Sequence, residues 1–458
     1  MALTFEEAVY AVRARPLVAR NGPAHVVIST DTRTLRSGEV FLALRGERFD
    51  GHHYVEAAVR HGAAAVVVER QPATALDVPV LLVEDTRAAY MRLAAAARAK
   101  TRATVIAITG STGKTTTKEL LGQLLRRTYG ERVAVSPANE NNEIGVSKLF
   151  LSVPPNAQVV VAEMGARHYG DIATLVDIAR PDVGILTNVR EAHLEIMQTQ
   201  ERLAQTKWAL FSTGARAVLN AGDAVSRERA AELRESPRWF GTGSVRPPEH
   251  QQTKGVYFLD RRRLRLIDDG RDELHAVDVR LPGDHNVENL AAAIAGALEA
   301  HCSPSEVLAG LADLELPAGR YESFLIPDRA RIIFDAYNAS ASGTIATLDA
   351  FRAEKARRRI AVLASMAELG SSAPQLHRDV GAYAARSGVD LLLVGGDHAD
   401  ELRGGAQGGG LRAEQIIDFR TTGEAAGWIR ENTTPDDVVL LKGSRRYKLE
   451  EIVEQLQR

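Results

Sequence analysis

The chain has 458 residues, of which 45% are hydrophobic and 25% are charged, a composition typical of soluble globular proteins. A formal net charge of −2 disfavours nucleic acid and anionic membranes as partners, and a single cysteine excludes an intrachain disulfide or a cysteine-rich zinc site. No stretch approaches the roughly 18 apolar residues that span a membrane and the N-terminus lacks a signal-peptide pattern, so we expect a cytoplasmic protein with no nucleic-acid partner and no membrane insertion.

Strand-like and helical patterns alternate along almost the whole chain. Several short apolar runs rich in β-branched residues, each followed by a polar turn, have the character of strands. They are Thr104–Thr109, Val159–Met164, Val183–Asn188, Ile332–Tyr337, Ile360–Met366, Leu391–Gly396 and Val438–Gly443. Near-continuous apolar strands separated by helices are typical of parallel sheets that are covered on both faces. The pattern therefore predicts an α/β protein.

The chain length and two changes in this pattern favour three domains. An Ala/Arg-rich helix closes the first domain near residue 100, and Pro and Gly within Leu314–Phe324 predict a second linker. The expected domains are 1–100, 101–315 and 316–458. Phe240–Gly255 is rich in helix and strand breakers and predicts a loop, and Gly404–Gly410 predicts a flexible surface loop.

The stretch "ITGSTGKTTTKELL" (Ile108–Leu121) places a glycine-rich turn between a predicted strand and a predicted helix. Gly110 and Gly113 let backbone amides approach phosphate oxygens, and the positive end of the following helix favours an anion. Lys114 can reach the outer phosphates of ATP, and Thr115 can ligate Mg²⁺. The predicted ATP-binding residues of this loop are Gly110, Ser111, Thr112, Gly113, Lys114, Thr115 and Thr116. The alternative is a turn with purely steric glycines, which leaves the lysine and threonines unexplained.

The spacing G-x-x-G-K-T-T resembles the shortened phosphate loop of the Mur ligases and folylpolyglutamate synthetases. Other segments, in chain order, are similar to Mur ligase signatures. They are Val159–Glu195, with "RP", "TN" and "AHLE", then Thr206–Phe211, Leu281–Ala295 and the linker "LPAGRYE". The resemblance covers nearly the whole chain. It implies a small UDP-binding N-terminal domain, a central P-loop-type ATPase domain with a parallel sheet, and a Rossmann-like C-terminal domain that binds the incoming amine.

Four segments are similar to the family member that joins D-alanyl-D-alanine to UDP-N-acetylmuramoyl-tripeptide. They are Ser29–Val68, Ala138–Leu151, Asp335–Gly343, and Met366–Gly370 followed by His377. The resemblance implies an ADP-forming amide ligase of peptidoglycan synthesis that works through an acyl phosphate. ATP and Mg²⁺ are the implied cofactors, and these two small molecules are the implied substrates. We expect a monomer whose domains close when the substrates bind.

The C-terminal domain departs from the family pattern at three places. Ala364-Ser365 stand where the family has Gly-Asp, Ser340-Ala341 stand for Asn-Pro, and Phe334 replaces an acid. These departures leave two alternatives open. One is a Mur-like ligase with a different amino-acid acceptor, and the other is a nucleotide-binding regulatory homologue without ligase activity.

The implied catalytic residues are Lys114, Lys207 and His193, and the implied metal ligands are Thr115, Glu163, His193 and carbamylated Lys207. Glu163 ends a predicted parallel strand, where sites of α/β proteins gather. On spacing alone Lys207 reads as an exposed helix lysine. The resemblance instead implies that CO₂ converts its amine into a carboxylate that helps to hold Mg²⁺.

Further ATP-binding residues implied by the resemblance are His285, Asn286, Arg320, Asp335 and Tyr337. Helix capping by Asp284 or Asn286 is an alternative role, and Tyr337 can equally be a buried strand tyrosine. The implied substrate-binding residues are Asp31, Thr32, Arg33, Asp50, Gly51 and His52 in the first domain, and Asn139, Asn141 and Asn142 in the second. Turn formation by the asparagines, and a structural ion pair of Arg33, remain open as alternatives.

Overall fold

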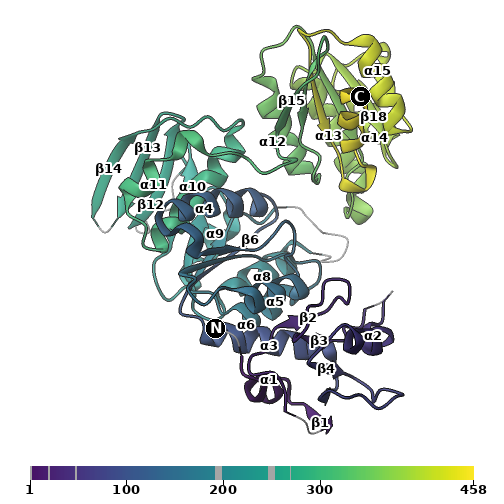
Figure 1. Ribbon diagram of the computed structural model, residues 1–458. Helices are drawn as coiled ribbons and strands as arrows, with labels where there is room; N and C mark the ends of the chain where they lie inside the picture. Colours follow the sequence, from purple (N-terminus) through teal and green to yellow (C-terminus); the bar gives the residue numbers. More distant parts are fainter. Residues whose placement is uncertain (1–2, 19–20, 47–48, 191–198, 246–252, 269) are drawn as a thin grey trace.

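The structure is a computed structural model that describes residues 3–18, 21–46, 49–190, 199–245, 253–268 and 270–458 (Figure 1). The described residues form three β-sheets of five, nine and six strands, which occupy successive parts of the chain. Helices cover these sheets, so the predicted α/β class is confirmed. Because no sheet crosses the expected limits after residues 100 and 315, we propose these limits as the domain boundaries.

The N-terminal sheet has the strand order β1-β5-β4-β3-β2, and only β1 runs antiparallel to its neighbour. Its strands are β1 (Arg15–Val18), β2 (Ile28–Ser29), β3 (Val40–Leu42), β4 (Ala65–Val68) and β5 (Val80–Leu82). The helices are α1 (Phe5–Val12), α2 (Val55–Arg60) and α3 (Thr86–Lys100). Buried apolar side chains on both faces of β3 and β4 form the core of this domain.

The central sheet has the order β14-β13-β12-β11-β10-β9-β6-β8-β7. Its strands are β6 (Thr104–Thr109), β7 (Val133–Val135), β8 (Val159–Glu163), β9 (Val183–Leu186), β10 (Arg216–Asn220), β11 (Arg238–Thr242), β12 (Lys254–Asp260), β13 (Arg263–Asp268) and β14 (Arg271–Ala276). The pairs from β7 to β12 are parallel, as predicted, whereas β12, β13 and β14 form an antiparallel edge that the sequence pattern did not reveal.

Helices lie on both faces of this sheet, which explains its nearly continuous apolar strands. The central helices are α4 (Lys114–Tyr129), α5 (Glu143–Ser152), α6 (Asp171–Ala179), α8 (Gln200–Trp208), α9 (Ala224–Arg229), α10 (Asp284–Glu299) and α11 (Pro304–Leu308). One core contains side chains of α4 and α10, and the other contains side chains of α5 and α6. Helix α3 packs against α1, α5 and α6, so it joins the N-terminal domain to the central one.

The C-terminal sheet has the order β15-β16-β20-β17-β18-β19, and only β15 runs antiparallel to its neighbour. Its strands are β15 (Glu322–Leu325), β16 (Arg331–Phe334), β17 (Arg359–Ala364), β18 (Leu391–Gly395), β19 (Ile416–Asp418) and β20 (Val438–Lys442). The helices are α12 (Ala341–Arg352), α13 (Ala373–Arg386), α14 (Ala399–Gly408), α15 (Thr422–Asn432) and α16 (Glu450–Gln457). Helices α12 to α14 cover one face of the sheet, and α15 and α16 cover the other.

Two loop predictions were wrong. Residues Gly404 to Gly408 belong to α14, and Gly405 allows this helix to pack closely against α13. Phe240 to Thr242 complete β11, and Lys254-Gly255 open β12, so the breaker-rich segment is shorter than predicted. Strands β9 and β16 end two or three residues before their predicted ends, where the chain turns into the site described below.

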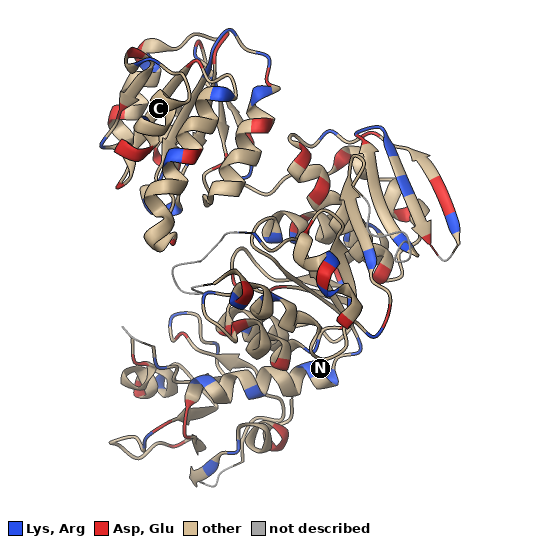
Figure 2. Cartoon of the chain, turned by 180° about the vertical axis from the view of Figure 1, so that it is seen from behind, with Lys and Arg blue, Asp and Glu red and all other residues tan. Residues whose placement is uncertain are grey.

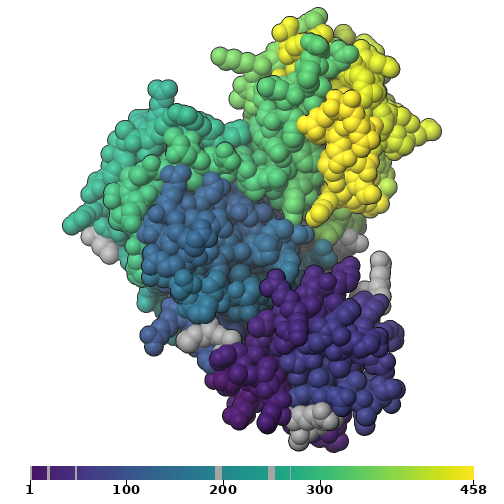
Figure 3. All heavy atoms as spheres, viewed as in Figure 1, coloured from purple at the N-terminus to yellow at the C-terminus, as the bar shows by residue number. Residues whose placement is uncertain are grey.

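The three domains are visible as separate bodies in Figure 3, with the N-terminal and C-terminal domains against different parts of the central one. Basic and acidic residues are interspersed along the ribbon, with neither sign confined to one domain (Figure 2). Among the described residues, no helix combines the length and the apolar character needed to cross a bilayer.

Candidate active site

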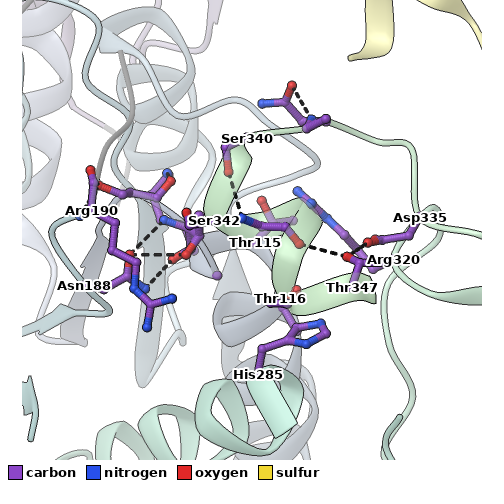
Figure 4. Close-up of a pocket in the computed structure, with 18 of the residues that line it drawn as sticks. Thr115, Thr116, Asn188, Arg190, His285, Arg320, Asp335, Ser340, Ser342 and Thr347 are labelled. Atoms are coloured by element: carbon purple, nitrogen blue, oxygen red, sulfur yellow. Dashed lines mark hydrogen bonds between the residues drawn. The ribbon is translucent and has the colours of Figure 1, made fainter. Parts of the chain in front are cut away.

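A cavity lies between the central and C-terminal domains (Figure 4). Residues Ser111–Thr116 of the glycine-rich loop form one wall, together with the first turns of α10. The facing wall comes from the C-terminal domain and contains Arg320, Asp335 and the start of α12. The structure thus brings together most of the predicted ATP-binding residues from segments that are far apart in the sequence.

The glycine-rich loop follows β6 and ends at Gly113, the residue that precedes α4. Gly110 and Gly113 have φ values of 151° and 81°, which favour glycine. A Cβ atom on Gly113 would lie 2.2 Å from the side-chain oxygen of Asn289, so this glycine is also needed for the close approach of α10. The predicted helix is α4, which begins at Lys114, and its N-terminus faces the cavity.

The segment after β9 braces this loop. The Thr112 backbone amide and hydroxyl each lie 3.2 Å from the Asn188 side-chain oxygen, and the Thr187 hydroxyl donates to the Thr112 carbonyl at 2.6 Å. The Ser111 hydroxyl donates to the Arg190 carbonyl at 2.8 Å. Asn188 and Arg190 also line the cavity, but sequence reasoning did not single them out. Their position at or just after the end of the predicted strand Val183–Asn188 was the available signal.

Two lysines converge on one backbone carbonyl. The Lys114 ammonium donates to the Gly110 carbonyl at 2.8 Å, and the Lys207 ammonium donates to the same oxygen at 2.9 Å. Burial lowers the pKa of Lys114, although Glu163 opposes this shift. Burial, and then the neighbouring charge of Lys114, lower the pKa of Lys207 well below its ordinary value. Lys207 is only 1% exposed, so its reading as an exposed helix lysine was wrong.

Glu163 ends β8 and is 2% exposed. One of its carboxylate oxygens accepts hydrogen bonds from the Thr115 hydroxyl at 3.2 Å and the Asn141 amide at 2.9 Å. The other oxygen has no hydrogen-bond partner among the described residues. A buried carboxylate oxygen without a donor, next to a hydroxyl, fits the oxygen ligands that Mg²⁺ prefers. His193, the other predicted metal ligand, lies outside the described residues.

Of the further predicted ATP-binding residues, His285, Asn286, Arg320 and Asp335 line the cavity, whereas Tyr337 does not. His285 and Asn286 lie in the first turn of α10. The residue at the N-cap position is Gly283, so neither Asp284 nor Asn286 caps this helix. Asn286 instead donates to the Pro282 carbonyl at 2.8 Å. Burial lowers the pKa of His285, which favours the neutral imidazole.

Asp335 lies in the cavity wall, 2.9 Å from the Lys442 ammonium. Burial raises the pKa of Asp335, but Lys442 and then Arg320 oppose it, so that the net shift is downward. Tyr337 follows the end of β16 and is therefore not a strand tyrosine. The guanidinium of Arg320 lies 4.7 Å from the centre of its ring, and the ring faces a different hollow. Lys442, the last residue of β20, is a cavity residue that the sequence reasoning did not identify.

The predicted residues of the N-terminal domain do not line this cavity. Asp31 and Arg33 form a two-point ion pair on the surface, and Thr32 lies in the turn between them. Asp50 accepts from the His52 backbone amide at 2.9 Å and from Arg70 at 2.8 Å, and Gly51 fits where a Cβ would meet the Leu44 carbonyl at 2.8 Å. These residues shape their own turns.

The three asparagines occupy the segment between β7 and α5. Asn141 reaches Glu163, as described above, and Asn142 caps α5 by accepting from the Gly145 amide at 2.9 Å. Asn139 is exposed. Asn141 therefore contacts the buried acid Glu163, Asn142 has a structural role as a helix cap, and Asn139 faces solvent.

Three comparisons with known proteins agree along the chain. Residues 26–98 match the Mur ligase family catalytic domain, residues 108–297 the Mur ligase middle domain, and residues 319–445 the Mur ligase glutamate ligase domain. The chain is 35% identical to the UDP-N-acetylmuramoyl-tripeptide–D-alanyl-D-alanine ligase of Synechocystis, over 94% of this chain and 91% of that protein. It is 31% identical to the Escherichia coli protein of the same name, over 94% and 93%.

Solved structures give the same result. MurF from Acinetobacter baumannii superimposes with a TM-score of 0.85 at 27% identity, covering 100% of this chain and 99% of that one. MurF from Thermotoga maritima in complex with ADP gives a TM-score of 0.79 at 27% identity, covering 94% and 96%. The sequence matches, the fold and the assembled phosphate loop lead to one conclusion: the chain belongs to the Mur ligase family.

Proposed function

We propose that this protein joins D-alanyl-D-alanine to UDP-N-acetylmuramoyl-tripeptide in an ATP-dependent, ADP-forming reaction of peptidoglycan synthesis. The observation that carries the proposal is the convergence of Lys114 and Lys207 beside the buried acid Glu163 and the start of α4. The printed names of the relatives support the choice of substrates.

The chemistry requires two anions to meet, because the tripeptide carboxylate attacks the terminal phosphate of ATP to give an acyl phosphate and ADP. Lys114 and the positive end of α4 lower the repulsion between these anions. The amine of D-alanyl-D-alanine then attacks the acyl carbon and releases phosphate. Fixed donors in a cavity between two domains hold the reactants in line at little reorganisation cost.

Magnesium belongs to the same proposal. Thr115 and Glu163 would hold the ion, joined by His193 and by a carbamate on Lys207. The ion would supply positive charge to the phosphate oxygens. The lowered pKa of Lys207 leaves its amine neutral more often, and only a neutral amine can react with CO₂.

On the nucleotide side, we propose that Arg320, Asp335 and His285 contact ATP from both walls of the cavity, with Asn286 supporting the turn. Lys442 keeps Asp335 ionised beside the nucleotide. Tyr337 would have to turn to reach the base. The turns at Asp31–Arg33 and Asp50–His52 are proposed as the site for the UDP end of the substrate.

The departures from the family pattern do not argue for a regulatory protein. Ser340 caps α12 by accepting from the Gly343 amide at 3.2 Å, a role that serine performs as well as asparagine. The buried Ser365 hydroxyl accepts from the His398 amide at 2.8 Å. Both serines therefore make hydrogen bonds of their own, and Lys114, Lys207 and Glu163 lie together beside the glycine-rich loop.

The proposal is tested by measuring phosphate release with UDP-N-acetylmuramoyl-tripeptide and a panel of amines. We expect release with D-alanyl-D-alanine, and little with D-alanine, L-lysine or diaminopimelate. Lys114→Ala should lower the rate by about 10²–10³-fold, the size expected for a fixed donor at a developing charge. The matched control is Lys100→Ala, since Lys100 pairs with Glu7 far from the cavity. Equal release with a single amino acid would point to another ligase, and full release without any amine would point to an ATPase.

The oligomeric state is part of the proposal: we infer a monomer, which light scattering of the purified protein would check. A mass of twice the chain would contradict it.

A further inference from the structure

Lys118 is a buried lysine for which the proposed chemistry has no use. It lies one turn after Lys114 on α4, and its side chain is 0% exposed. Its ammonium donates to the Ser136 carbonyl at 2.9 Å and to the Ala138 carbonyl at 2.7 Å. It does not line the cavity, and its two hydrogen bonds direct it towards the segment between β7 and α5.

Two carboxylates balance the buried charge of Lys118. The Glu119 carboxylate lies 3.1 Å from its ammonium, and the Glu163 oxygen without a hydrogen-bond partner lies 3.6 Å away. A buried ammonium is costly unless carbonyls and carboxylates surround it, and an apolar side chain of similar size would fill the same space more simply. The charge at this position therefore calls for a role other than packing.

The segment that Lys118 grips, residues 136–142, is joined to Glu163 at two further points. The Glu163 amide donates to the Ser136 hydroxyl at 3.0 Å, and the Asn141 side chain donates to the Glu163 carboxylate at 2.9 Å. Ala138 has a φ of 41°, in the left-handed region that alanine rarely adopts. The Lys118 ammonium thus binds the carbonyl of the one residue in the segment whose backbone is strained, and holds it in that conformation.

We propose that Lys118 is a positioning residue, which fixes the 136–142 segment and thereby sets Asn139 and Asn141 for the UDP-linked substrate. The proposal rests on the proposed function, because it assigns that substrate to this side of the site. Lys114 contacts the phosphates of ATP, and Lys118, one helical turn away, positions the segment that binds the carboxylate-bearing substrate. One face of α4 therefore organises both reactants.

The first test compares Lys118→Met with the wild-type enzyme. Methionine keeps the unbranched apolar stem but removes the ammonium. We expect the amides of residues 138–142 to exchange hydrogen at least about tenfold faster. We also expect KM for UDP-N-acetylmuramoyl-tripeptide to rise about tenfold while KM for ATP changes less than about threefold, the size expected for losing hydrogen bonds from a charged group. Lys118→Arg, which keeps the charge and several donors, should restore much of both properties.

The matched control is Lys148→Met. Lys148 contacts the same segment through Glu140 at 2.7 Å, but its side chain is 59% exposed, so its loss should leave exchange and both KM values nearly unchanged. If Lys118→Met does not fold, Lys118→Gln, which keeps one polar donor in the same place, replaces it in the test. We expect changes in hydrogen exchange and in the two KM values of the same direction and similar size.

Three outcomes overturn the proposal: unchanged exchange in the segment, equal increases in both KM values, or a fall in thermal stability that Lys118→Arg does not reverse. Hydrogen exchange needs no catalysis, so the two proposals can fail separately. A wild-type enzyme that consumes no ATP with these substrates, combined with faster exchange in Lys118→Met, overturns the ligase function and leaves the positioning role. An active ligase with unchanged exchange overturns the positioning role alone.

Discussion

Lys207 shows how much of a residue's chemistry depends on its surroundings. In the sequence it is an ordinary helix lysine, whereas in the structure it is buried against Gly110 with Lys114 as its neighbour. Burial disfavours the charged form of both amines, and the charge of Lys114 further lowers the pKa of Lys207. The result is an amine that is more easily neutralised than any exposed lysine.

We predict that this amine carries a carbamate in the active enzyme. Labelled bicarbonate should give a carbamate signal in ¹³C NMR spectra of the wild type but not of Lys207→Arg, because arginine cannot form it. The variant should lose about 10²-fold or more in turnover, since a cation would replace a negative charge beside the metal. The result would contradict the prediction if Lys207→Arg kept full activity. Lys100→Arg serves as the control.

His377 illustrates a pH effect at the same scale. It is 0% exposed, one ring nitrogen lies 2.6 Å from the Ala373 carbonyl, and the other accepts from the Met366 amide at 2.8 Å. Only a neutral ring can donate to one partner and accept from the other. Burial is the main cause that lowers the pKa of His377, and the charge of the stacked His398 acts in the same direction.

The pH dependence of stability follows from this shift. The folded state binds the proton less readily than the unfolded state, so stability is full above the unfolded pKa of about 6.5 and is lost as the pH falls through it. Urea unfolding at about pH 7.5 and about pH 5.5 should show a smaller unfolding free energy at the lower pH. His377→Gln should weaken this pH dependence of the unfolding free energy. Part of the dependence should remain, because the pKa of His285 is also lowered. The exposed His61→Gln should leave it unchanged, and an unchanged slope in His377→Gln would contradict the assignment.

At the scale of elements, α13 and α14 show why a glycine-rich segment can be helical. A Cβ on Gly405 would lie 2.0 Å from the Arg378 carbonyl, and one on Gly381 would lie 2.1 Å from the Leu402 carbonyl. The two helices therefore approach backbone to backbone, and each provides glycine at the contact. The burial of Gly405 and Ala406 offsets the low helix propensity of this segment.

We predict opposite effects from two alanine substitutions in α14. Gly405→Ala should lower the unfolding free energy by about 1–3 kcal/mol, because the added methyl group forces the helices apart. Gly404→Ala should leave stability unchanged or raise it by up to ~1 kcal/mol, because its Cβ meets no atom within 4 Å and alanine favours the helix. Denaturant unfolding of both variants measures the difference. A stable Gly405→Ala would show that the helices do not pack as closely as described.

At the scale of the whole molecule, the cavity joins groups from two domains. The phosphate loop belongs to the central domain, whereas Arg320, Asp335 and Lys442 belong to the C-terminal domain or its linker (Figure 4). The turns of the N-terminal domain do not reach this cavity, although they are proposed to hold one end of the same substrate. The groups proposed to bind the reactants are therefore spread over all three domains.

We therefore predict that the enzyme closes when it is fully loaded. Small-angle scattering should show a smaller radius of gyration with a non-hydrolysable ATP analogue plus UDP-N-acetylmuramoyl-tripeptide. Lys114→Ala, with a weakened grip on the phosphates, should need more analogue to reach the same radius. Identical profiles with and without ligands would exclude a large closure.

The sequence alone determined the α/β class, the central strands and the phosphate loop, because strand periodicity, glycine at positive φ and a following helix are local properties of the chain. It also placed Glu163 at a strand end, which follows from strand length alone. Lys118 and Lys442 could not be recognised this way. Their roles depend on which distant carbonyl or carboxylate faces them, and a lysine in a strand or helix carries no local mark of its partner.

The tertiary structure decided burial and pairing. It made Lys207 a buried amine, turned a glycine-rich segment into a packed helix, and directed Tyr337 away from the cavity. Each outcome depends on contacts between residues that are far apart in the chain. A short stretch of sequence does not show which of these contacts form. The local sequence therefore determines the glycine-rich loop, whereas tertiary contacts determine which charged side chains lie next to it.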